Sequence, residues 1–440
     1  MSYAQAMHRR QARGEPIVIH FEAIALAMYF IRDAAGGMLR YYSSIYGVEA
    51  LWFLPDIAAI GCIVLFVNRC IVRNQSIFAF IVLLQILLSL VIGYVFLGTV
   101  NAALSSFKMI APIFVGFCFC DASLGSYKRL LSILALTFYL SIGGVYLSAY
   151  VPLPWVGFTY ESFGAARTAG RLWWTMSEQR LAGFAADNTM AGFFILITFV
   201  LTSIRSSTIW CLVFGSLSMY AIRLTTSKTT MVVLGFYLLC LLIVRALPER
   251  MRFPAVRHLA LWSFAAIFVP FILILFLSGT NLTTTSSFLF SMQDRINNSW
   301  QLPFSYLWQL MPIGLVTGCG LGCFNYPMQL FSPWASLWVP VDNFYIGTYL
   351  MFGLPFVGFM WMVFRASFLI NDVYKLCTIF TMNLFTITVL SYGPATGLLM
   401  IALGFSEVFS LHASRQMHRN SAGRDRVPVL PASPPLAAAE

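Results

Sequence analysis

Long runs of apolar residues alternate with short polar segments along almost the whole chain. A run of roughly 17–25 apolar residues crosses the hydrocarbon core of a bilayer as a helix. On this basis the pattern predicts about twelve spans, the first being the weakest because it is short and contains His20 and Glu22. The predicted spans begin near residues 17, 48, 76, 107, 130, 184, 209, 230, 260, 345, 376 and 395. We therefore expect an all-α polytopic membrane protein whose transmembrane domain covers residues 17–412.

Composition supports the same class of protein. Of the 440 residues, 59% are hydrophobic and only 10% are charged, whereas a soluble domain carries roughly 25% charged residues. The mean hydropathy of +0.80 agrees with lipid as the main solvent of this chain. These values exclude an ordinary soluble enzyme, and we expect membrane lipid rather than nucleic acid as the surrounding partner.

Basic residues divide unequally between the two sides of the predicted membrane domain. Lys and Arg remain in cytoplasmic loops because their translocation is costly. Most of the 27 basic residues fall in the cytoplasm if the N-terminus lies there, including a cluster at 245–257 and the Arg-rich tail. We therefore expect a cytoplasmic N-terminus over 1–16, a disordered Pro- and Ala-rich cytoplasmic tail over 413–440, and a large outward-facing loop over 279–344 between spans nine and ten.

The remaining basic residues lie in outer loops or in the outer half of a span. Cations in such places often mark the path of a substrate. Ion pairing with carboxylates on the same side is the alternative, and both interpretations stay open. Several converging cations suit a polyanionic ligand, because the guanidinium fork matches phosphate oxygens. These residues are Arg32, Arg40, Lys108, Arg167, Arg171, Arg180, Arg223, Lys228 and Arg295.

Tryptophans gather at the same predicted outer surface. They fit an aromatic belt at the membrane interface, and they also fit stacking on sugar rings. Both interpretations are kept. The residues are Trp155, Trp173, Trp174, Trp300, Trp308, Trp334 and Trp338.

Cysteines and glycines offer little chemistry of their own. Most of the nine cysteines fall inside predicted spans, and only Cys319 and Cys323 lie in the outer loop. Because glycines surround that pair, we favour close backbone packing there over a disulfide. The glycine-rich segment 318–322 would let the backbone approach a phosphate or another helix. No Cys/His cluster has metal-ligand spacing, so we expect neither a metal nor a cofactor.

Five short motifs follow one another between residues 170 and 360. They are Arg180 to Ala191 (R-x-x-G-x-x-x-D-x-x-x-A), Leu224 to Thr229 (T-x-S-K), Arg295 to Trp300 (R-x4-W), Pro312 to Gly322, which is rich in glycine, and Asp342 to Tyr345 (D-N-x-Y). In this order they resemble the motifs of the bacterial O-antigen ligase and Wzy-type polysaccharide polymerase superfamily, in which the second motif is T-x-S-R, with Arg where this chain has Lys228, and the fourth is P-x-x-G-x-G-x-G.

The resemblance implies a glycosyltransferase of GT-C-type architecture in the bacterial inner membrane. Such an enzyme acts at the periplasmic leaflet on sugars linked to undecaprenyl diphosphate. Ligases of the superfamily usually carry His where this chain has Asp342, so the resemblance is closer to the polymerases. It implies lipid-linked oligosaccharide as both donor and acceptor, with a chain-length regulator and a flippase as accompanying partners.

Glycosyl transfer from a lipid diphosphate requires neutralisation of the leaving group, which cations can provide in place of a metal. We assign Arg180, Lys228 and Arg295 to this role, together with Arg171. Loss of the bidentate fork makes Lys228 a weaker clamp than Arg.

The acceptor hydroxyl needs a carboxylate base, for which Asp342 is the first candidate and Glu178 and Asp294 follow. Asp342 could equally cap a helix that begins near Asn343. Asn343, Trp300 and Tyr345, with Glu178 and Asp294, are the candidates for orienting a sugar.

Two other functions remain compatible with the sequence. An O-antigen ligase would join polymer to lipid A core, although Asp342 in place of His disfavours it. A transporter such as a lipid-linked oligosaccharide flippase would open its cavity to both leaflets, whereas the unusual residues here gather at one face.

Overall fold

The computed structural model describes residues 20–162, 165–168, 174–175, 178–277, 292–389, 392 and 395–410. This part of the chain is mostly helical and is compatible with an all-α membrane protein. The predicted N-terminal segment 1–16 and the predicted tail 413–440 lie outside the described residues, as does the start of the outer loop.

Six of the described helices are long and apolar enough to cross a membrane. They are η1–α4–η2 (Glu49–Arg73), α5 (Ile77–Leu97), α6–α7 (Val100–Phe117), α8 (Lys128–Tyr150), α11 (Lys228–Ala246) and α12–η4–α13 (Glu249–Leu277). Shorter apolar helices are α9 (Asn188–Ser203), α10 (Thr208–Leu224), α19 (Leu354–Ser367), α20 (Val373–Phe385) and α21–η7 (Ala395–Phe409). The segment predicted as a weak first span forms α2 (Phe21–Ala34), which is not among these apolar helices, and α3 (Gly36–Ile45) follows it.

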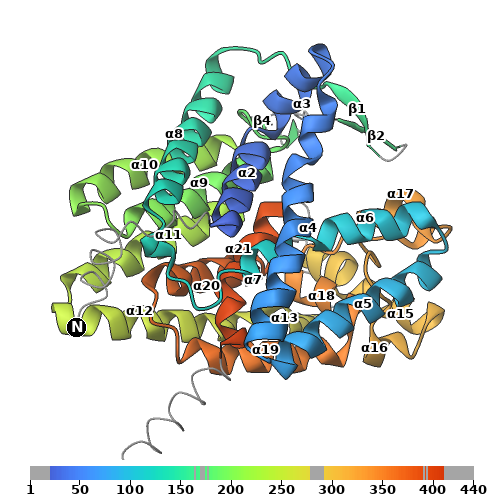
Figure 1. Cartoon of the computed structure of the whole chain (residues 1–440). Helices are drawn as coiled ribbons and strands as arrows, with labels where there is room; N and C mark the ends of the chain where they lie inside the picture. The colour runs from blue at the N-terminus through green and yellow to red at the C-terminus, as the bar shows by residue number, and fades with distance from the viewer. Residues whose placement is uncertain are drawn as a thin grey trace, which may run out of the picture.

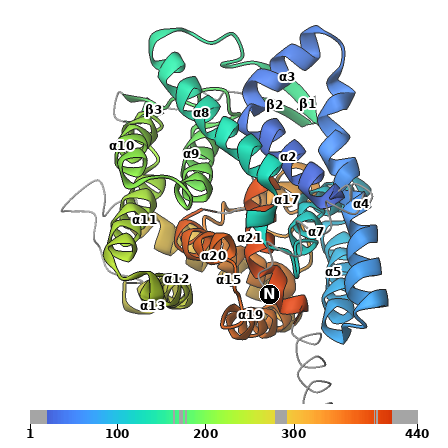
Figure 2. The same ribbon diagram turned by 60° about the vertical axis from the view of Figure 1, so that its left-hand side comes forward.

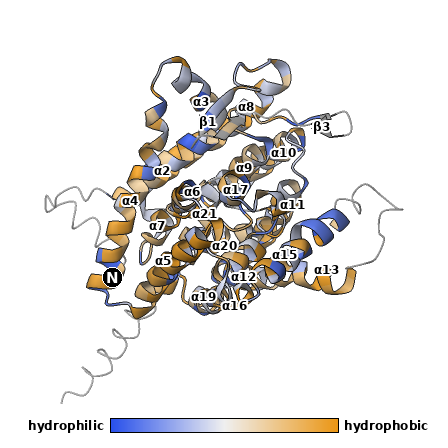
Figure 3. Cartoon of the chain, turned by 90° about the vertical axis from the view of Figure 1, so that its right-hand side faces the viewer, coloured by the Kyte–Doolittle hydropathy of each residue, from blue (hydrophilic) through white to orange (hydrophobic). Residues whose placement is uncertain are grey.

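Helix α5 shows how composition sets both the ends and the faces of a span. Ser76 caps its N-terminus by accepting a hydrogen bond from the Ala79 N–H, and Gly98 ends it at φ +74. Its large side chains are largely exposed, whereas Ala79, Ser89 and Gly93 are buried. Small residues let another backbone approach closely, so the small face packs inward and the apolar face is left for lipid. Apolar colouring along α4, α5 and α13 is evident in Figure 3.

Helix α21 lies in the middle of the described structure, with α2, α7 and α20 around it (Figures 1 and 2). Its contact with α7 (Pro112–Phe117) is close because α7 contributes Gly116, where an added Cβ would lie 2.4 Å from the Leu399 carbonyl oxygen. Helix α9 packs against α8, α10 and α20 and is buried along nearly its whole length. The core therefore joins helices from both halves of the sequence.

The described part of the predicted outer loop is built of short helices rather than of irregular polar chain. These are η5 (Arg295–Gln301), α15 (Leu302–Leu310), α16 (Gly314–Thr317), α17 (Tyr326–Phe331) and η6 (Ala335–Leu337), followed by α18 (Phe344–Phe352). Helix α17 packs on α5 and α6 (Val100–Ile110), and α16 packs on α18 and α19. The loop thus covers the membrane helices instead of standing apart from them.

The glycine-rich segment of this loop packs directly on α5 and α18. An added Cβ at Gly320 would lie 2.0 Å from the backbone nitrogen of Gly93, and one at Gly318 would lie 2.2 Å from the Met351 carbonyl oxygen. Gly320 and Gly318 also have positive φ angles of +88 and +79, which residues with a side chain rarely adopt. The close approach to a helix is therefore confirmed.

The expectation that Cys319 and Cys323 are not bridged is wrong. The two residues form a disulfide, with a Cα–Cα distance of 6.0 Å. The positive-φ glycines bend the segment so that side chains four residues apart face each other, and the same bend permits the backbone packing. Packing and a disulfide therefore coexist where we treated them as alternatives.

Two small hairpins were not expected. Strand β1 (Thr159–Ser162) pairs antiparallel with β2 (Ala165–Thr168), Thr159 opposite Thr168, and β3 (Trp174–Thr175) pairs with β4 (Glu178–Gln179). The first hairpin lies beside α3 in Figure 1. Both are too short for period-2 alternation to reveal them in the sequence.

Candidate functional site

The segment after Arg180 is held against the turn that precedes Lys228. The Leu181 N–H donates to the Leu224 carbonyl (3.2 Å), and the Asn188 side-chain amide donates to the Thr225 carbonyl (3.0 Å). Asp187 caps α9 by accepting a hydrogen bond from the Met190 N–H. The structure therefore brings together the first two motifs, although about 40 residues of chain separate them.

Helix α11 begins at this turn with Lys228 as its first residue. The side chain of Ser227 does not cap the helix, because its hydroxyl is hydrogen-bonded to the Thr230 hydroxyl (2.6 Å). A helix N-terminus without a side-chain cap leaves N–H groups that favour an anion. The exposed Lys228 adds a full positive charge at the same place.

A segment after α20 joins this turn to the fifth motif. The Thr229 hydroxyl is hydrogen-bonded to the Thr388 hydroxyl (2.5 Å), and the Ile387 carbonyl accepts a hydrogen bond from the Asn343 amide (2.7 Å). The Phe344 N–H donates to the Thr386 carbonyl (3.1 Å). Residues 386–388 therefore connect the start of α11 to the start of α18, and sequence reasoning did not identify them because no charged or motif residue marks them.

The cap of α18 is Asn343 and not Asp342. The Asn343 side chain accepts a hydrogen bond from the Ile346 N–H (2.8 Å), and its backbone has the extended angles of a cap. The suggestion that Asp342 caps this helix is therefore wrong by one residue. Asp and Asn are both favoured as helix N-caps, so the sequence alone could not tell which of these adjacent residues caps α18.

The Asp342 carboxylate instead faces Arg295, with 3.6 Å between Oδ2 and Nε. The two side chains are 43% and 32% exposed, so solvent and ligand can reach both. Partial burial raises the pKa of Asp342; Arg295 lowers it by a smaller amount, and nearby Asp294 makes the smallest contribution, which raises it. A carboxylate with a raised pKa is a better proton acceptor at neutral pH than an ordinary aspartate.

Three residues expected to orient a sugar are buried. Trp300 is 2% exposed, Tyr345 is 3% exposed and Asn343 is fully buried. The Tyr345 hydroxyl donates to the Asn383 side-chain oxygen (2.6 Å), which ties α18 to α20. In this conformation the two rings and the amide lie in the packed interior between helices, and their expected contact with a sugar stays a prediction.

Other candidates lie at the margin of the described structure. Asp294 is exposed and accepts a hydrogen bond from the Asn298 amide (2.7 Å). Arg171 and the side chain of Glu178 lie outside the described residues, so their expected roles stay predictions. Arg180 is half-buried and engaged in a further contact.

Some of the outer cations pair with carboxylates that the sequence did not single out. Arg32 contacts Asp33 (2.7 Å) and Asp56 (3.0 Å), and the Lys108 ammonium lies 3.6 Å from Asp56. The Thr396 hydroxyl donates to Asp33 (2.6 Å), which anchors the start of α21 to this network. For Arg32 and Lys108 the ion-pairing alternative is therefore confirmed.

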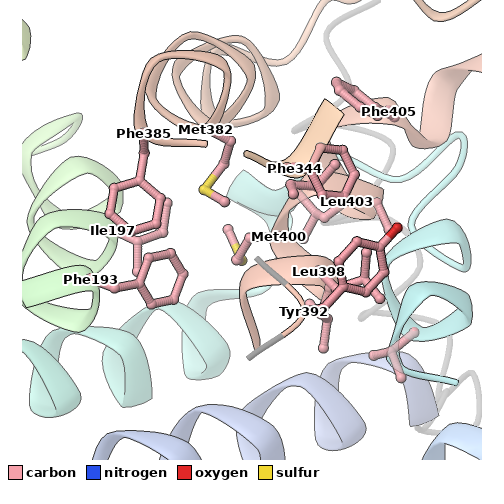
Figure 4. Packing of buried hydrophobic residues seen from close by; sticks show 14 of the residues in the cluster. Phe193, Ile197, Phe344, Met382, Phe385, Tyr392, Leu398, Met400, Leu403 and Phe405 are labelled. Carbon is pink, nitrogen blue, oxygen red and sulfur yellow. The ribbon is translucent and has the colours of Figure 1, made fainter. Parts of the chain in front are cut away.

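The motif-bearing helices share a core beneath the candidate site. Phe193 of α9 lies against Phe385 of α20, with 5.3 Å between ring centroids, and Phe344 stacks on Tyr392 at 5.5 Å. Figure 4 shows these four rings with Met382 around one apolar region. The packing fixes the ends of α9, α18 and α20 relative to one another.

An apolar groove of about 470 Å³ runs between α10 and α11. Leu212, Met219, Leu238 and Leu242 line most of it. Arg223 lies at the end next to the Leu224 to Lys228 turn. The groove therefore leads from an apolar wall to the cations of the candidate site.

Among the described residues, no group of three or more His, Cys, Asp and Glu side chains is arranged to hold a metal ion. Comparison of the chain with protein-family models, curated proteins and solved structures gives no match.

Proposed function

We propose that this protein polymerises oligosaccharide repeat units linked to undecaprenyl diphosphate, at the periplasmic leaflet of a bacterial inner membrane. The proposal includes a GT-C-type architecture with about twelve spans. The observation that carries it is that residues 386–388 connect the start of α11, next to Lys228, with the start of α18, next to the Arg295–Asp342 pair, while the segment after Arg180 is bonded to the turn before Lys228.

The donor diphosphate would lie among the cations at the start of α11. Lys228 is exposed there, and the helix N-terminus contributes the positive end of its dipole. As the bond between the anomeric carbon and the diphosphate oxygen breaks, negative charge grows on that oxygen. Fixed cations stabilise this charge more in the transition state than in the bound substrate, which lowers the barrier.

The polyprenyl chain of the donor would occupy the groove between α10 and α11. Its apolar lining suits an isoprenoid, and its Arg223 end lies one turn from Lys228. One ligand with a lipid chain and a diphosphate head would therefore satisfy the groove and the cations together.

Asp342 would accept the proton of the acceptor hydroxyl. The hydroxyl oxygen attacks the anomeric carbon, the diphosphate leaves, and the proton passes to the carboxylate. Arg295 contacts Asp342 and would also reach the leaving group, so it holds the base beside the reacting bond. The raised pKa of Asp342 supports this role.

Reconstitution with a lipid-linked repeat unit tests the proposal. Purified protein in proteoliposomes should produce a ladder of products on a gel, and the Asp342→Asn variant should not. A single transfer to lipid A core without a ladder would indicate a ligase. Movement of the substrate between leaflets without new glycosidic bonds would indicate a flippase, and either result would refute the polymerase.

A further inference from the structure

A second cavity, of about 400 Å³, lies between α8, α9 and α10. Lys128 and Ser132 of α8 line it, as do Arg205 and Ser206 at the end of α9. Leu131, Leu134, Ala135 and Leu201 form its apolar wall, and Tyr139, Thr202, Trp210 and Tyr374 complete it.

Polar and apolar groups occupy different parts of this cavity. Lys128 is the first residue of α8, and Arg205 lies two residues beyond the end of α9. Because Arg205 donates to the Gly125 carbonyl, just before α8, both cations stand at one end of the cavity. Tyr139 is eleven residues further along α8, roughly 16 Å at 1.5 Å per residue. There its hydroxyl accepts a hydrogen bond from the Trp210 indole N–H (3.2 Å). The two cations thus mark one end of the cavity, its mouth, and the rest is lined by apolar side chains together with Ser132, Thr202 and the Tyr139 hydroxyl.

The two cations keep their charge unpaired within the part of the chain that the structure describes. Neither Lys128 nor Arg205 forms an ion pair with a carboxylate among the described residues. One Arg205 nitrogen donates to the Gly125 carbonyl (2.9 Å), and the guanidinium lies 5.7 Å from the Tyr374 ring centre. These contacts hold Arg205 at the mouth while other N–H groups of its guanidinium stay free for an anion.

The surface of α8 beside the cavity is apolar and exposed. Leu136 and Leu140, on the adjoining face of α8, are 58% and 51% exposed. Basic pockets between helices on the cytoplasmic side of membrane proteins suit anionic lipid headgroups. Lys128 and Arg205 both fall on the side that the charge distribution predicts to be cytoplasmic.

We propose that this cavity binds one anionic phospholipid, with its phosphate at Lys128 and Arg205 and an acyl chain along the wall of Leu131, Ala135 and Leu201. Helix α9 separates this site from the candidate diphosphate site at its other end, about 24 Å away over sixteen residues. The two sites therefore face different leaflets. The inference does not depend on the polymerase activity.

Native mass spectrometry of the purified full chain with added phosphatidylglycerol or phosphatidylcholine tests the site. We expect one phosphatidylglycerol to be retained in preference to phosphatidylcholine. Lys128→Ala and Arg205→Ala should each weaken its binding by about fivefold, and the double variant by roughly 25-fold, because each cation near a membrane surface contributes a comparable attraction. Arg129→Ala is the matched control, since Arg129 is exposed beside Lys128 and does not line the cavity.

Two further variants separate a lipid site from other causes. Ala135→Leu fills the wall without altering charge and should also reduce retention. If Arg205→Ala disturbs the turn at Gly125, to which Arg205 donates a hydrogen bond, Lys128→Ala still tests the contribution of a cation to lipid binding. Equal binding of phosphatidylcholine, equal loss in Arg129→Ala, or displacement of phosphatidylglycerol by inorganic phosphate at the same concentration would each overturn the proposal.

Discussion

Replacing Asp342 by Asn separates proton transfer from helix capping, because the structure assigns these roles to neighbouring residues. Asn343 caps α18 and also bonds the Ile387 carbonyl, whereas Asp342 contacts Arg295. The Asp342→Asn change keeps the size of the side chain and removes its ability to accept a proton at neutral pH. We expect polymer formation to fall by at least about a hundredfold, the lower end of what general base catalysis contributes.

Stability should respond differently. Both side chains of the Asp342–Arg295 ion pair are about one third exposed or more, and such pairs contribute about 0–1 kcal/mol at most. Folding raises the pKa of Asp342, so the ionised carboxylate is less stable in the folded than in the unfolded chain. Stability from this group is present at low pH and is lost as pH rises through the raised pKa. At neutral pH, Asp342→Asn should therefore not lower the unfolding temperature.

Asn343→Ala is the matched comparison. It removes the cap and the hydrogen bond to Ile387, which together cost about 1.5–3 kcal/mol. The assay measures product ladders and thermal unfolding on the same reconstituted samples, because an export defect in cells could imitate lost catalysis. Wild-type activity should fall as pH drops through the raised pKa of Asp342. If Asp342→Asn keeps most of its activity, the carboxylate is not the base and the reasoning is refuted.

Arg295→Ala should lower polymer formation by about 10²-fold or more, since one charge-stabilising donor contributes roughly 3 kcal/mol, while unfolding changes by less than about 1 kcal/mol. Lys228→Arg should retain activity because it keeps the charge, whereas Lys228→Ala should lose it; equal activity of the two in the ladder assay would remove this cation from the mechanism. Cys319→Ser, or reduction of the wild type, should lower the free energy of unfolding by about 2 kcal/mol, the entropy expected for so short a loop, as measured by thermal melts with and without reductant. A cysteine at Asn298 should react with an impermeant reagent from outside intact spheroplasts, whereas one at Arg250 should not; the opposite labelling would reverse the predicted orientation.

Much of the helical architecture follows from the sequence, because lipid requires each crossing segment to satisfy its own backbone and to be apolar over its full length. Long apolar runs such as Ile77–Leu97 and Lys128–Tyr150 can therefore be recognised as helices from the sequence alone. The glycine-rich segment 318–322 could likewise be read as a site of close backbone approach, since only glycine tolerates both the contact and the positive φ. The expected orientation of the helices in the membrane rests on composition and on the placement of the cations, and it stays a prediction.

The tertiary structure decided which side chains face the candidate site. Trp300 and Tyr345 belong to motifs by their spacing, but both side chains are buried. Whether such a side chain points into the core depends on the direction of its helix and not on the residue type. Asn343 takes the cap because it directly precedes the first helical residue, has extended backbone angles and accepts a hydrogen bond from the Ile346 N–H. Partners far apart in sequence, such as Arg32 with Asp56 and Thr229 with Thr388, meet only when the helices assemble. Local sequence fixes which segments form helices, whereas contacts between distant segments determine which charged groups remain free to meet a substrate.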